Sequence, residues 1–521
     1  MRTVFGEGNL ARLRLGTRRS LLAMSQSGWV ASEIARLNPG VTVELVGIDT
    51  RGDKVLDVPL TQVQGKEFFV AELDHALRQG EVDLSVHSMK DLSLDRPEEF
   101  VLGAVPRREN QRDIAIFSHR VFERIQKGLP VRIGTSSPRR QENLPRFFVD
   151  ALPHLNGKPQ VLIQELRGNV NTRLGRLHEP EGSDRALDGV VLAFAGLIRL
   201  WMNETAQEEL SRLLMGTRTM VLPLTHSPAA AAQGVLAVEC RKSDIRVREF
   251  LRPLHSAAAE AEARLEREVL RKWGGGCHQR FGASALTHPE LGSLLLMRGK
   301  ASGGHVLDEV VWSAPELDRS QVRGAFNGIQ FKGERQSLSS NRPVIKDDSG
   351  IAVFVAHSAA VQNEDLDSLK SARIWTSGAS SWFKLAAKGL WVEGCAEGLG
   401  AEWLKAIIAE PVLRLPAWGA QWSVFTHQDA RETWDSCRVF ATYQIDWPEN
   451  VIDSARKSLS QASHCYWSSP TQWSALHELA SSTAVHSCGP GKTAVFLRSL
   501  GVRPSVFPSP AHWEKWLGVE S

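Results

Sequence analysis

A lone cysteine behind three glycines is the most reactive arrangement in the sequence. Gly274, Gly275 and Gly276 end a predicted helix over residues 257–273, and Cys277 follows directly. Three glycines can simply cap a helix and form a turn, but they also let the backbone bring a thiol close to another molecule. Most lone cysteines are buried and inert. A predicted exposed turn instead favours Cys277 as a reactive thiol.

Arginines form a second pattern, because many lie in predicted loops between a strand and a helix. A single arginine most often belongs to a surface ion pair. These arginines, however, stand beside glycine, serine and threonine, where the backbone N–H groups of a starting helix also bind carboxylates. Arg139 and Arg140, directly after the predicted helix cap Ser137, are the clearest example. Arginine binds carboxylates through paired hydrogen bonds and keeps its charge at any working pH, so it suits a ligand with several carboxylates.

Predicted strands and helices alternate through the first part of the chain and must position these groups. Apolar strands separated by helices imply parallel sheets covered on both faces. Ligands of such sheets bind at the carboxyl ends of the strands, which is where the polar motifs fall. The predicted strands are 13–15, 41–48, 82–86, 131–134, 161–165 and 190–193, and the predicted helices are 20–37, 68–77 and 257–273.

Composition excludes several classes of protein. The chain has 521 residues, enough for about three or four domains, and its net charge of +3 argues against bulk nucleic-acid binding. Its six cysteines form no CxxC pair, so we expect reduced thiols and no structural zinc. No apolar run approaches the roughly 18 residues of a membrane span. Residues 17–22 resemble a twin-arginine signal but lack the apolar stretch after it, so a cytoplasmic protein is expected.

A change in composition near residue 345 predicts two fused units. Only four of the 16 tryptophans precede that point, and both tyrosines follow it. Arginine shows the opposite trend and is sparse in the last third of the chain. Residues 332–348 are polar and are predicted to form a linker between the units.

Residues 10–331 resemble the porphobilinogen deaminase (hydroxymethylbilane synthase) family. Nine short motifs occur in the family's order, which leaves little room for chance even though each motif alone is weak evidence. They are LGTRRS at 15–20, TRGD at 50–53, GKEFF at 65–69, VHSMKD at 86–91, GTSSPRR at 134–140, LRGNVNTR at 166–173, AGLIR at 195–199, AQG at 232–234 and GGC at 275–277.

The resemblance implies an α/β fold of three domains. Two lobes like those of type II periplasmic binding proteins are expected over residues 10–106 with 223–245 and over residues 107–222. A small α+β domain over residues 246–331 is expected to carry the cofactor, a dipyrromethane in thioether linkage to Cys277. The implied reaction joins four porphobilinogens head to tail with loss of ammonia, and hydrolysis then releases hydroxymethylbilane.

The resemblance also assigns roles to individual residues. Asp91 matches the catalytic aspartate, expected to bind the pyrrole N–H, stabilise positive charge and assist proton transfer; its simpler interpretation is a helix N-terminal aspartate. Lys90, counted with it as catalytic, is expected to pair with a substrate carboxylate. Gln62 replaces a frequent lysine and removes one cation near the cleft. The residues expected to bind substrate or cofactor are Arg18, Ser20, Lys66, Ser88, Ser136, Ser137, Arg139, Arg140, Arg167, Arg173 and Arg199, and no metal is expected.

Residues 349–521 resemble uroporphyrinogen-III synthase, which closes hydroxymethylbilane into a ring with inversion of the last pyrrole. The matching motifs are FATYQ at 440–444, YWSSPT at 466–471 and CGPGKTA at 488–494. The resemblance implies two α/β lobes joined by a β-ladder, with Tyr443, Ser469 and Thr493 at the site. The family's opening strand and helix are not recognisable before Val353, and arginines are sparse. A degenerate module with a scaffolding role is therefore the alternative.

Two other classes of function compete with this interpretation. A carboxylate-binding module without catalysis needs the arginines but neither Asp91 nor a cysteine after three glycines. A nucleotide-binding enzyme is excluded because no GxGxxG or P-loop motif follows a predicted strand. The expected partners are therefore small-molecule substrates, porphobilinogen and hydroxymethylbilane. The protein is expected to be a monomer that binds neither nucleic acid nor a membrane.

Overall fold

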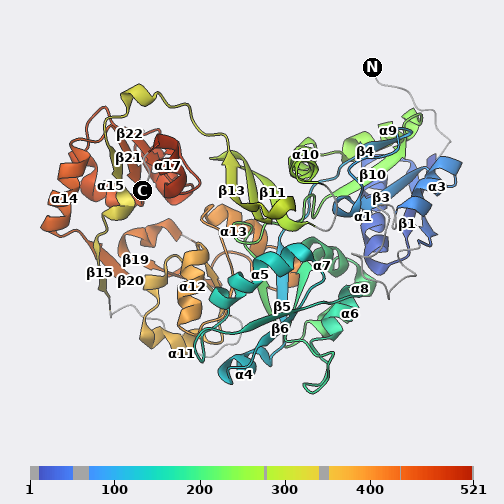
Figure 1. Ribbon diagram of the computed structural model, residues 1–521, viewed down its shortest axis with the longest axis horizontal. Coiled ribbons are helices and arrows are strands. Elements are labelled where there is room, and N and C mark those ends of the chain that lie inside the picture. The colour runs from blue at the N-terminus through green and yellow to red at the C-terminus, as the bar shows by residue number, and fades with distance from the viewer. Residues whose placement is uncertain (1–10, 51–69, 275–278, 339–350, 435, 519–521) are drawn as a thin grey trace.

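The computed structural model describes residues 11–50, 70–274, 279–338, 351–434 and 436–518, and their strands form five sheets flanked by helices (Figure 1). Cys277 and Lys66 lie outside these described residues. The mixed α/β class expected from the sequence is confirmed. No helix within the described residues has the length and apolar character needed to cross a membrane.

The first sheet has the strand order β2-β1-β3-β10-β4. Its first three strands in chain order are parallel, and β10 inserts antiparallel between β3 and β4. Leu15 and Leu84 are fully buried, as expected for a sheet covered by helices. The elements are β1 (Ala11–Arg18), α1 (Leu21–Leu37), β2 (Val41–Ile48), α3 (Ala71–Gln79), β3 (Leu84–Ser88), β4 (Phe100–Ala104), β10 (Leu236–Arg241) and α9 (Ile245–Leu251).

The second sheet has the strand order β7-β6-β8-β5-β9, with β5 antiparallel to both of its neighbours. The chain passes between the two sheets through residues 105–112 and returns through residues 222–235, and these two crossings are together named the hinge. The elements are β5 (Asp113–Phe117), α4 (Val121–Gln126), β6 (Val131–Gly134), α5 (Pro138–Ala151), β7 (Val161–Gln164), α6 (Val170–Gly175), β8 (Gly189–Ala193), α7 (Phe194–Trp201), α8 (Glu204–Leu213) and β9 (Arg218–Val221).

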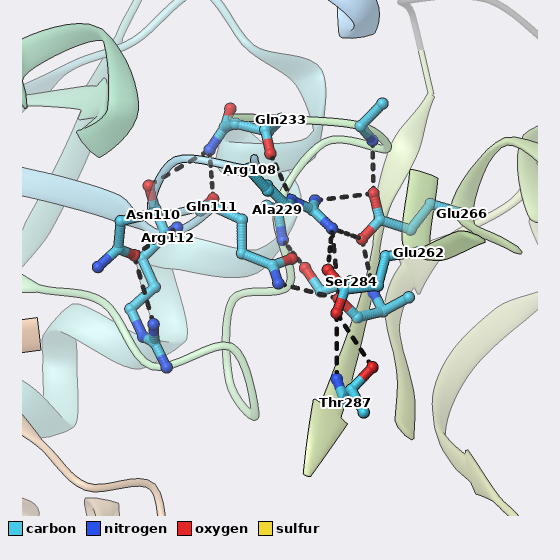
Figure 2. A network of polar contacts seen from close by, with 12 residues as sticks. Arg108, Asn110, Gln111, Arg112, Ala229, Gln233, Glu262, Glu266, Ser284 and Thr287 are labelled. Atoms are coloured by element: carbon cyan, nitrogen blue, oxygen red, sulfur yellow. Dashed lines mark hydrogen bonds and ion pairs between the residues drawn. The ribbon is translucent and has the colours of Figure 1, made fainter. Parts of the chain in front are cut away.

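A third sheet and helix α10 (Ala257–Lys272) are tied to both crossings by one buried carboxylate, shown in Figure 2. Arg108 of the first crossing donates to both oxygens of Glu266 on α10, at 2.8 and 2.9 Å. Glu266 also accepts from the N–H of Ala232 in the second crossing (2.5 Å) and of Ala285 on β11 (2.6 Å). The sheet is antiparallel and consists of β11 (Arg280–His288), β12 (Gly292–Lys300) and β13 (Val306–Trp312).

The second unit has two lobes. The sheet of one lobe has the order β15-β20-β19-β16-β17-β18, and that of the other has the order β14-β21-β22-β23. The main elements are β14 (Ala325–Asn327), β15 (Glu334–Ser337), β16 (Ala352–Val355), α11 (Leu366–Leu369), β17 (Arg373–Thr376), α12 (Ala379–Ala387), β18 (Val392–Cys395), α13 (Ala401–Ile408), β19 (Trp422–His427), β20 (Arg438–Asp446), α14 (Glu449–Leu459), β21 (His464–Trp467), α15 (Pro470–Leu476), β22 (Val485–Cys488), α16 (Lys492–Ser499), β23 (Ser505–Val506) and α17 (Pro510–Leu517).

The start of the second unit differs from the sequence-based expectation. β14 lies within the region assigned to the cofactor domain but pairs with β21 of the last lobe. Residues 334–337, predicted to lie in a linker, form β15 and pair with β20. β15 is polar and exposed along its whole length, so no apolar alternation revealed it. A strand therefore does precede Val353, and the second unit begins before residue 331.

The first lobe of the second unit packs directly on the second sheet. The rings of Trp391 and Phe117 meet edge to face at 5.2 Å, and those of Trp382 and Phe147 at 5.4 Å. Both indoles also donate across the boundary, Trp382 to the carbonyl of Ala151 (3.0 Å) and Trp391 to a carbonyl on β9 (3.1 Å). The two units thus share one apolar core.

Candidate functional site

The turn after β3 carries the predicted catalytic pair. β3 ends at Ser88, and a short 3-10 helix, Met89–Asp91, leaves the sheet at its carboxyl end. The Asp91 side chain is exposed, whereas Lys90 is partly buried. Burial lowers the pKa of Lys90, and the charges of Arg140 and Arg139 lower it further, while Asp91 opposes them. The lysine therefore stands among charges from both lobes.

An arginine that sequence reasoning missed holds this turn in place. Arg267 on α10 donates to the backbone carbonyls of Met89 and Leu92, both at 3.1 Å, and of Ser93, at 2.6 Å. The helix that leads to Cys277 thus fixes the backbone around Asp91. No sequence signal pointed to Arg267, because its partners are carbonyl groups far away in the chain.

Beneath the turn lies a buried charged cluster that is already satisfied. Asp74, His87 and Glu239 are the group in the described residues that could ligate a metal ion. Arg96 occupies the centre of this group, with hydrogen bonds to Asp74 (2.6 Å) and to Glu239 (2.7 and 2.9 Å). Burial, helped by Arg96, lowers the pKa of His87 to about 4. The Arg96 guanidinium therefore supplies the positive charge that a metal ion would bring to this group, and His87 is a neutral residue that supports the turn.

The facing wall comes from the second lobe, where α5 begins after Ser136 and Ser137. Arg139 and Arg140 are both buried and share Asp113, at 2.8 and 2.7 Å. Burial alone raises the pKa of Asp113, but the two guanidiniums outweigh it and hold that pKa well below its usual range.

These two arginines differ from the expectation that they simply line an open cleft, because their charge is partly balanced inside the lobe. Each also donates to a backbone carbonyl, Arg139 to Pro228 and Arg140 to Val191, both at 2.8 Å. Their buried Nε atoms have no hydrogen-bond partner among the described residues. Ser137 stands at the N-cap position, as predicted, but its side chain makes no capping hydrogen bond.

Further arginines extend the positive charge along this wall. Burial and the charges of Arg140 and Arg167 lower the pKa of Arg173 on α6 to about 10, so these three cations lie close together. Burial lowers the pKa of Arg199 on α7 to about 10 as well, and its guanidinium donates to the carbonyl of Gly234 at 2.7 Å. A cluster of guanidiniums suits an anion that carries several carboxylates.

The predicted residues of the first lobe lie near the ends of its strands. Arg18 ends β1, and its charge contributes to the lowered pKa of His87 beneath the turn. Ser20 caps α1 by accepting from the N–H of Ala23 at 3.4 Å. Ser88 donates to the side-chain carbonyl of Gln26 at 3.2 Å. Ser20 and Ser88 thus have structural partners in addition to any ligand.

The three residues predicted for the second unit lie on different elements. Tyr443 lies on β20 opposite Ser337, is buried, and has a pKa raised by that burial. Ser469 caps α15 by accepting from the N–H of Gln472 at 3.1 Å, and it also bonds with Thr471 at 2.9 Å. Thr493 stands in the first turn of α16.

Basic residues that sequence reasoning missed surround Tyr443 and the start of α16. The His427 ring lies 5.7 Å from that of Tyr443, and Arg335 approaches Nε2 of His357 at 3.5 Å. Burial and the neighbouring cations lower the pKa of His357 to about 4. Burial also lowers the pKa of Lys492 to about 7, with its Nζ 3.2 Å from the centre of the Trp434 ring.

Comparison with known proteins identifies the family. Residues 13–249 match the family model described as porphobilinogen deaminase, dipyromethane cofactor binding domain. The porphobilinogen deaminase of Syntrophotalea carbinolica is 39% identical over 311 residues, which are 60% of this chain and 89% of that protein. That of Trichlorobacter lovleyi is 41% identical over 272 residues, 52% of this chain and 78% of that protein. The chloroplastic enzyme of Euglena gracilis is 39% identical over 267 residues, 51% of each chain. The chain therefore belongs to the porphobilinogen deaminase family and contains its dipyrromethane cofactor binding domain.

Proposed function

We propose that this chain polymerises four porphobilinogens into hydroxymethylbilane on a dipyrromethane attached to Cys277, with Asp91 and Lys90 at the reacting centre. The observation that carries the assignment is that the Lys90–Asp91 turn of one lobe and an arginine of the other bond with neighbouring residues: the N–H of Met89 donates to the carbonyl of Val235 at 3.0 Å, and Arg199 donates to that of Gly234 at 2.7 Å. Bound through the cysteine, the cofactor supplies the pyrrole carbon to which the first substrate is joined.

The residues of the chain have separate tasks in this reaction. Loss of ammonia from the aminomethyl group of porphobilinogen leaves positive charge next to the pyrrole, and the Asp91 carboxylate stabilises it. The exposed Asp91 side chain can also accept the pyrrole N–H. Arg139, Arg140 and Arg173 attract the acetate and propionate groups of the growing chain, since guanidiniums stay charged even when burial lowers their pKa.

For the second unit we propose cyclisation of hydroxymethylbilane to uroporphyrinogen III. The two-lobed arrangement and the basic residues around Tyr443 support this proposal, because the substrate carries eight carboxylates. The scaffolding alternative keeps the fold without this activity. It is favoured by the sparse arginines of the unit and by the capping role of Ser469.

Two measurements test these assignments in order. The intact mass of the purified chain, with peptide mapping, is expected to show a dipyrromethane-sized addition on the Cys277 peptide. If the adduct is absent even after incubation with porphobilinogen or preformed hydroxymethylbilane, the chain is a carboxylate-binding module instead. Feeding porphobilinogen and separating the uroporphyrinogen isomers then tests the second unit: isomer III indicates an active synthase, and isomer I alone indicates a scaffold.

A further inference from the structure

The hinge of the deaminase lobes is in contact with the second unit. Any change in the angle between the first two sheets must be absorbed by the crossings 105–112 and 222–235. If the chain elongates its product as proposed above, the bound oligopyrrole lengthens at every addition inside one cleft. The angle between the two lobes must then increase with each addition. A contact that restrains the hinge therefore slows late additions more than early ones.

One carboxylate of the second unit binds both crossings. Glu397 follows β18, and its carboxylate accepts from Nε of Arg112, the last residue of the first crossing, at 2.6 Å. The other oxygen of Glu397 accepts from the backbone N–H of Thr225 in the second crossing at 3.3 Å. The side chains of Arg112 and Glu397 are 6% and 0% exposed, so water screens this ion pair little. Figure 2 shows Arg112 beside Asn110, its other partner within the crossing.

The same loop reaches the third sheet. Nε2 of His288 on β11 donates to the carbonyl of Leu399 at 3.0 Å, while its Nδ1 accepts from the N–H of Glu290. The Arg112 guanidinium also lies 5.5 Å from the ring of Trp403 on α13. A loop of three residues, Glu397–Leu399, therefore bonds with both crossings and with the third sheet.

Two further observations indicate that this contact is under constraint. Glu397 has φ +58°, a left-handed conformation that residues with side chains seldom adopt. Burial and then the charge of Glu109, in the first crossing, raise the pKa of Glu410 at the far end of α13 to about 7. Glu397 is thus the acidic side chain of the second unit that bonds with both crossings.

We propose that Glu397 is a positioning residue through which the second unit restrains the deaminase hinge and slows the late additions relative to the early ones. It touches no reacting atom. Its effect passes through Arg112 and Thr225 to the two crossings, and so to the angle at which the arginine wall faces the Lys90–Asp91 turn.

The test compares two like substitutions in the holoprotein. Glu397→Gln keeps the shape of the side chain but removes its charge. Glu290→Gln is the matched control, because Glu290 also pairs across the two units, with Arg498, yet it touches neither crossing. Each variant is mixed rapidly with porphobilinogen, quenched, and weighed intact, which counts the pyrroles added at each time.

We expect Glu397→Gln to raise the ratio of the fourth to the first addition rate by about threefold or more, and Glu290→Gln to leave it unchanged. Hydrogen exchange in residues 105–112 and 222–235 is expected to be faster in Glu397→Gln only. An equal ratio in the two variants, with equal exchange, overturns the inference. If wild type adds no pyrroles at all, the proposed function fails instead.

A second variant covers the case in which Glu397→Gln does not fold. Arg112→Lys keeps the positive charge but loses the Nε hydrogen bond, so it loosens the same contact from the deaminase side. It is expected to change the ratio in the same direction and by less. A ratio equal to that of wild type in folded Arg112→Lys also overturns the inference.

Discussion

The two anion sites proposed for this molecule contain different cations. The deaminase cleft uses arginines, whose guanidiniums stay charged even where burial lowers the pKa of Arg173 and Arg199 to about 10. The second unit instead combines Arg335 with histidines and with Lys492, whose pKa is about 7. His357, with a pKa of about 4, is neutral near pH 7.

The difference shows how burial acts on each kind of cation. Desolvation lowers the pKa of every buried base, but a guanidinium starts so high that it never loses its proton in the working range. A buried ammonium or imidazolium can lose its proton within that range. The deaminase site is therefore expected to keep its positive charge throughout the working pH range, whereas the second site keeps the charge of Arg335 but loses that of Lys492 as the pH rises.

Removing the carboxylate of the catalytic turn is expected to have the largest effect. Asp91→Ala should lower the rate of bilane formation by about 100-fold or more, because positive charge at the reacting centre loses its partner. The cofactor should still be attached, as intact mass will show.

Cys277→Ala should also abolish turnover, but without any added mass. Near-normal turnover in either variant contradicts the site assignment.

The pH dependence of the second unit sharpens the comparison. Because the pKa of Lys492 is about 7, its charge is present below pH 7 and is lost as the pH rises above it. The yield of uroporphyrinogen III relative to isomer I should then fall between pH 6 and pH 8, with Lys492→Gln lowering the apparent affinity about tenfold. Lys492→Arg should keep the high yield at pH 8. If the yield does not change with pH in wild type or in either variant, Lys492 has no role in binding the substrate.

The support beneath the catalytic turn predicts a smaller loss. Arg267→Gln removes hydrogen bonds to three backbone carbonyls, so kcat should fall about tenfold while KM changes less. Arg267→Lys should recover part of kcat. The control is Arg271→Gln on the same helix, since Arg271 is 62% exposed. If Arg267→Gln loses thermal stability but keeps its kcat, Arg267 has only a structural role.

The smallest effect is expected at the boundary between the units. Burial and the charge of Arg298 lower the pKa of His226, which stacks edge to face on Phe383 of the second unit, to about 4. The unfolded chain binds a proton near pH 6.5 and the folded one does not, so stability falls as the pH drops from about 6.5 towards 4.

After allowance for solvent, the cost at pH 5 is about 1 kcal/mol, or a few degrees in Tm. His226→Gln should remove this part of the pH dependence. The measurement is the difference between the Tm values at pH 7 and pH 5 in the two proteins, because other buried histidines contribute equally to both. Identical differences contradict the assignment.

Helices, strands and local motifs could be predicted from the sequence. Contacts between residues far apart in the chain could not. The strands β2, β6 and β8 were predicted with nearly their observed bounds, because Val- and Ile-rich runs are typical of strands, whereas β1 extends over Ala11–Arg18 and only residues 13–15 were predicted. The turn at Lys90 and Asp91 follows directly from the end of such a strand. The helix start at Ser137 was also predicted, with Arg139 and Arg140 in the first turn of α5.

What the sequence could not show depends on partners far along the chain. Asp113 binds Arg139 and Arg140 from a strand in the middle of the second sheet, and nothing local marks it. Arg112 and Glu397 are separated by 285 positions. β15 has the polar sequence of a loop and is a strand only because β20 supplies hydrogen bonds along its length.

The early start of the second unit bears on how this gene could have been assembled or taken apart. Trp312, the last residue of β13, already packs on Phe507 and His512 near the C-terminus, and β14 begins at Ala325. A break in the polar stretch 332–348 would leave one half with a stray strand and the other with an unpaired sheet edge. Because β14, before this stretch, and β15, within it, pair with the second unit, splitting the gene there is expected to leave an unpaired sheet edge that is prone to aggregate.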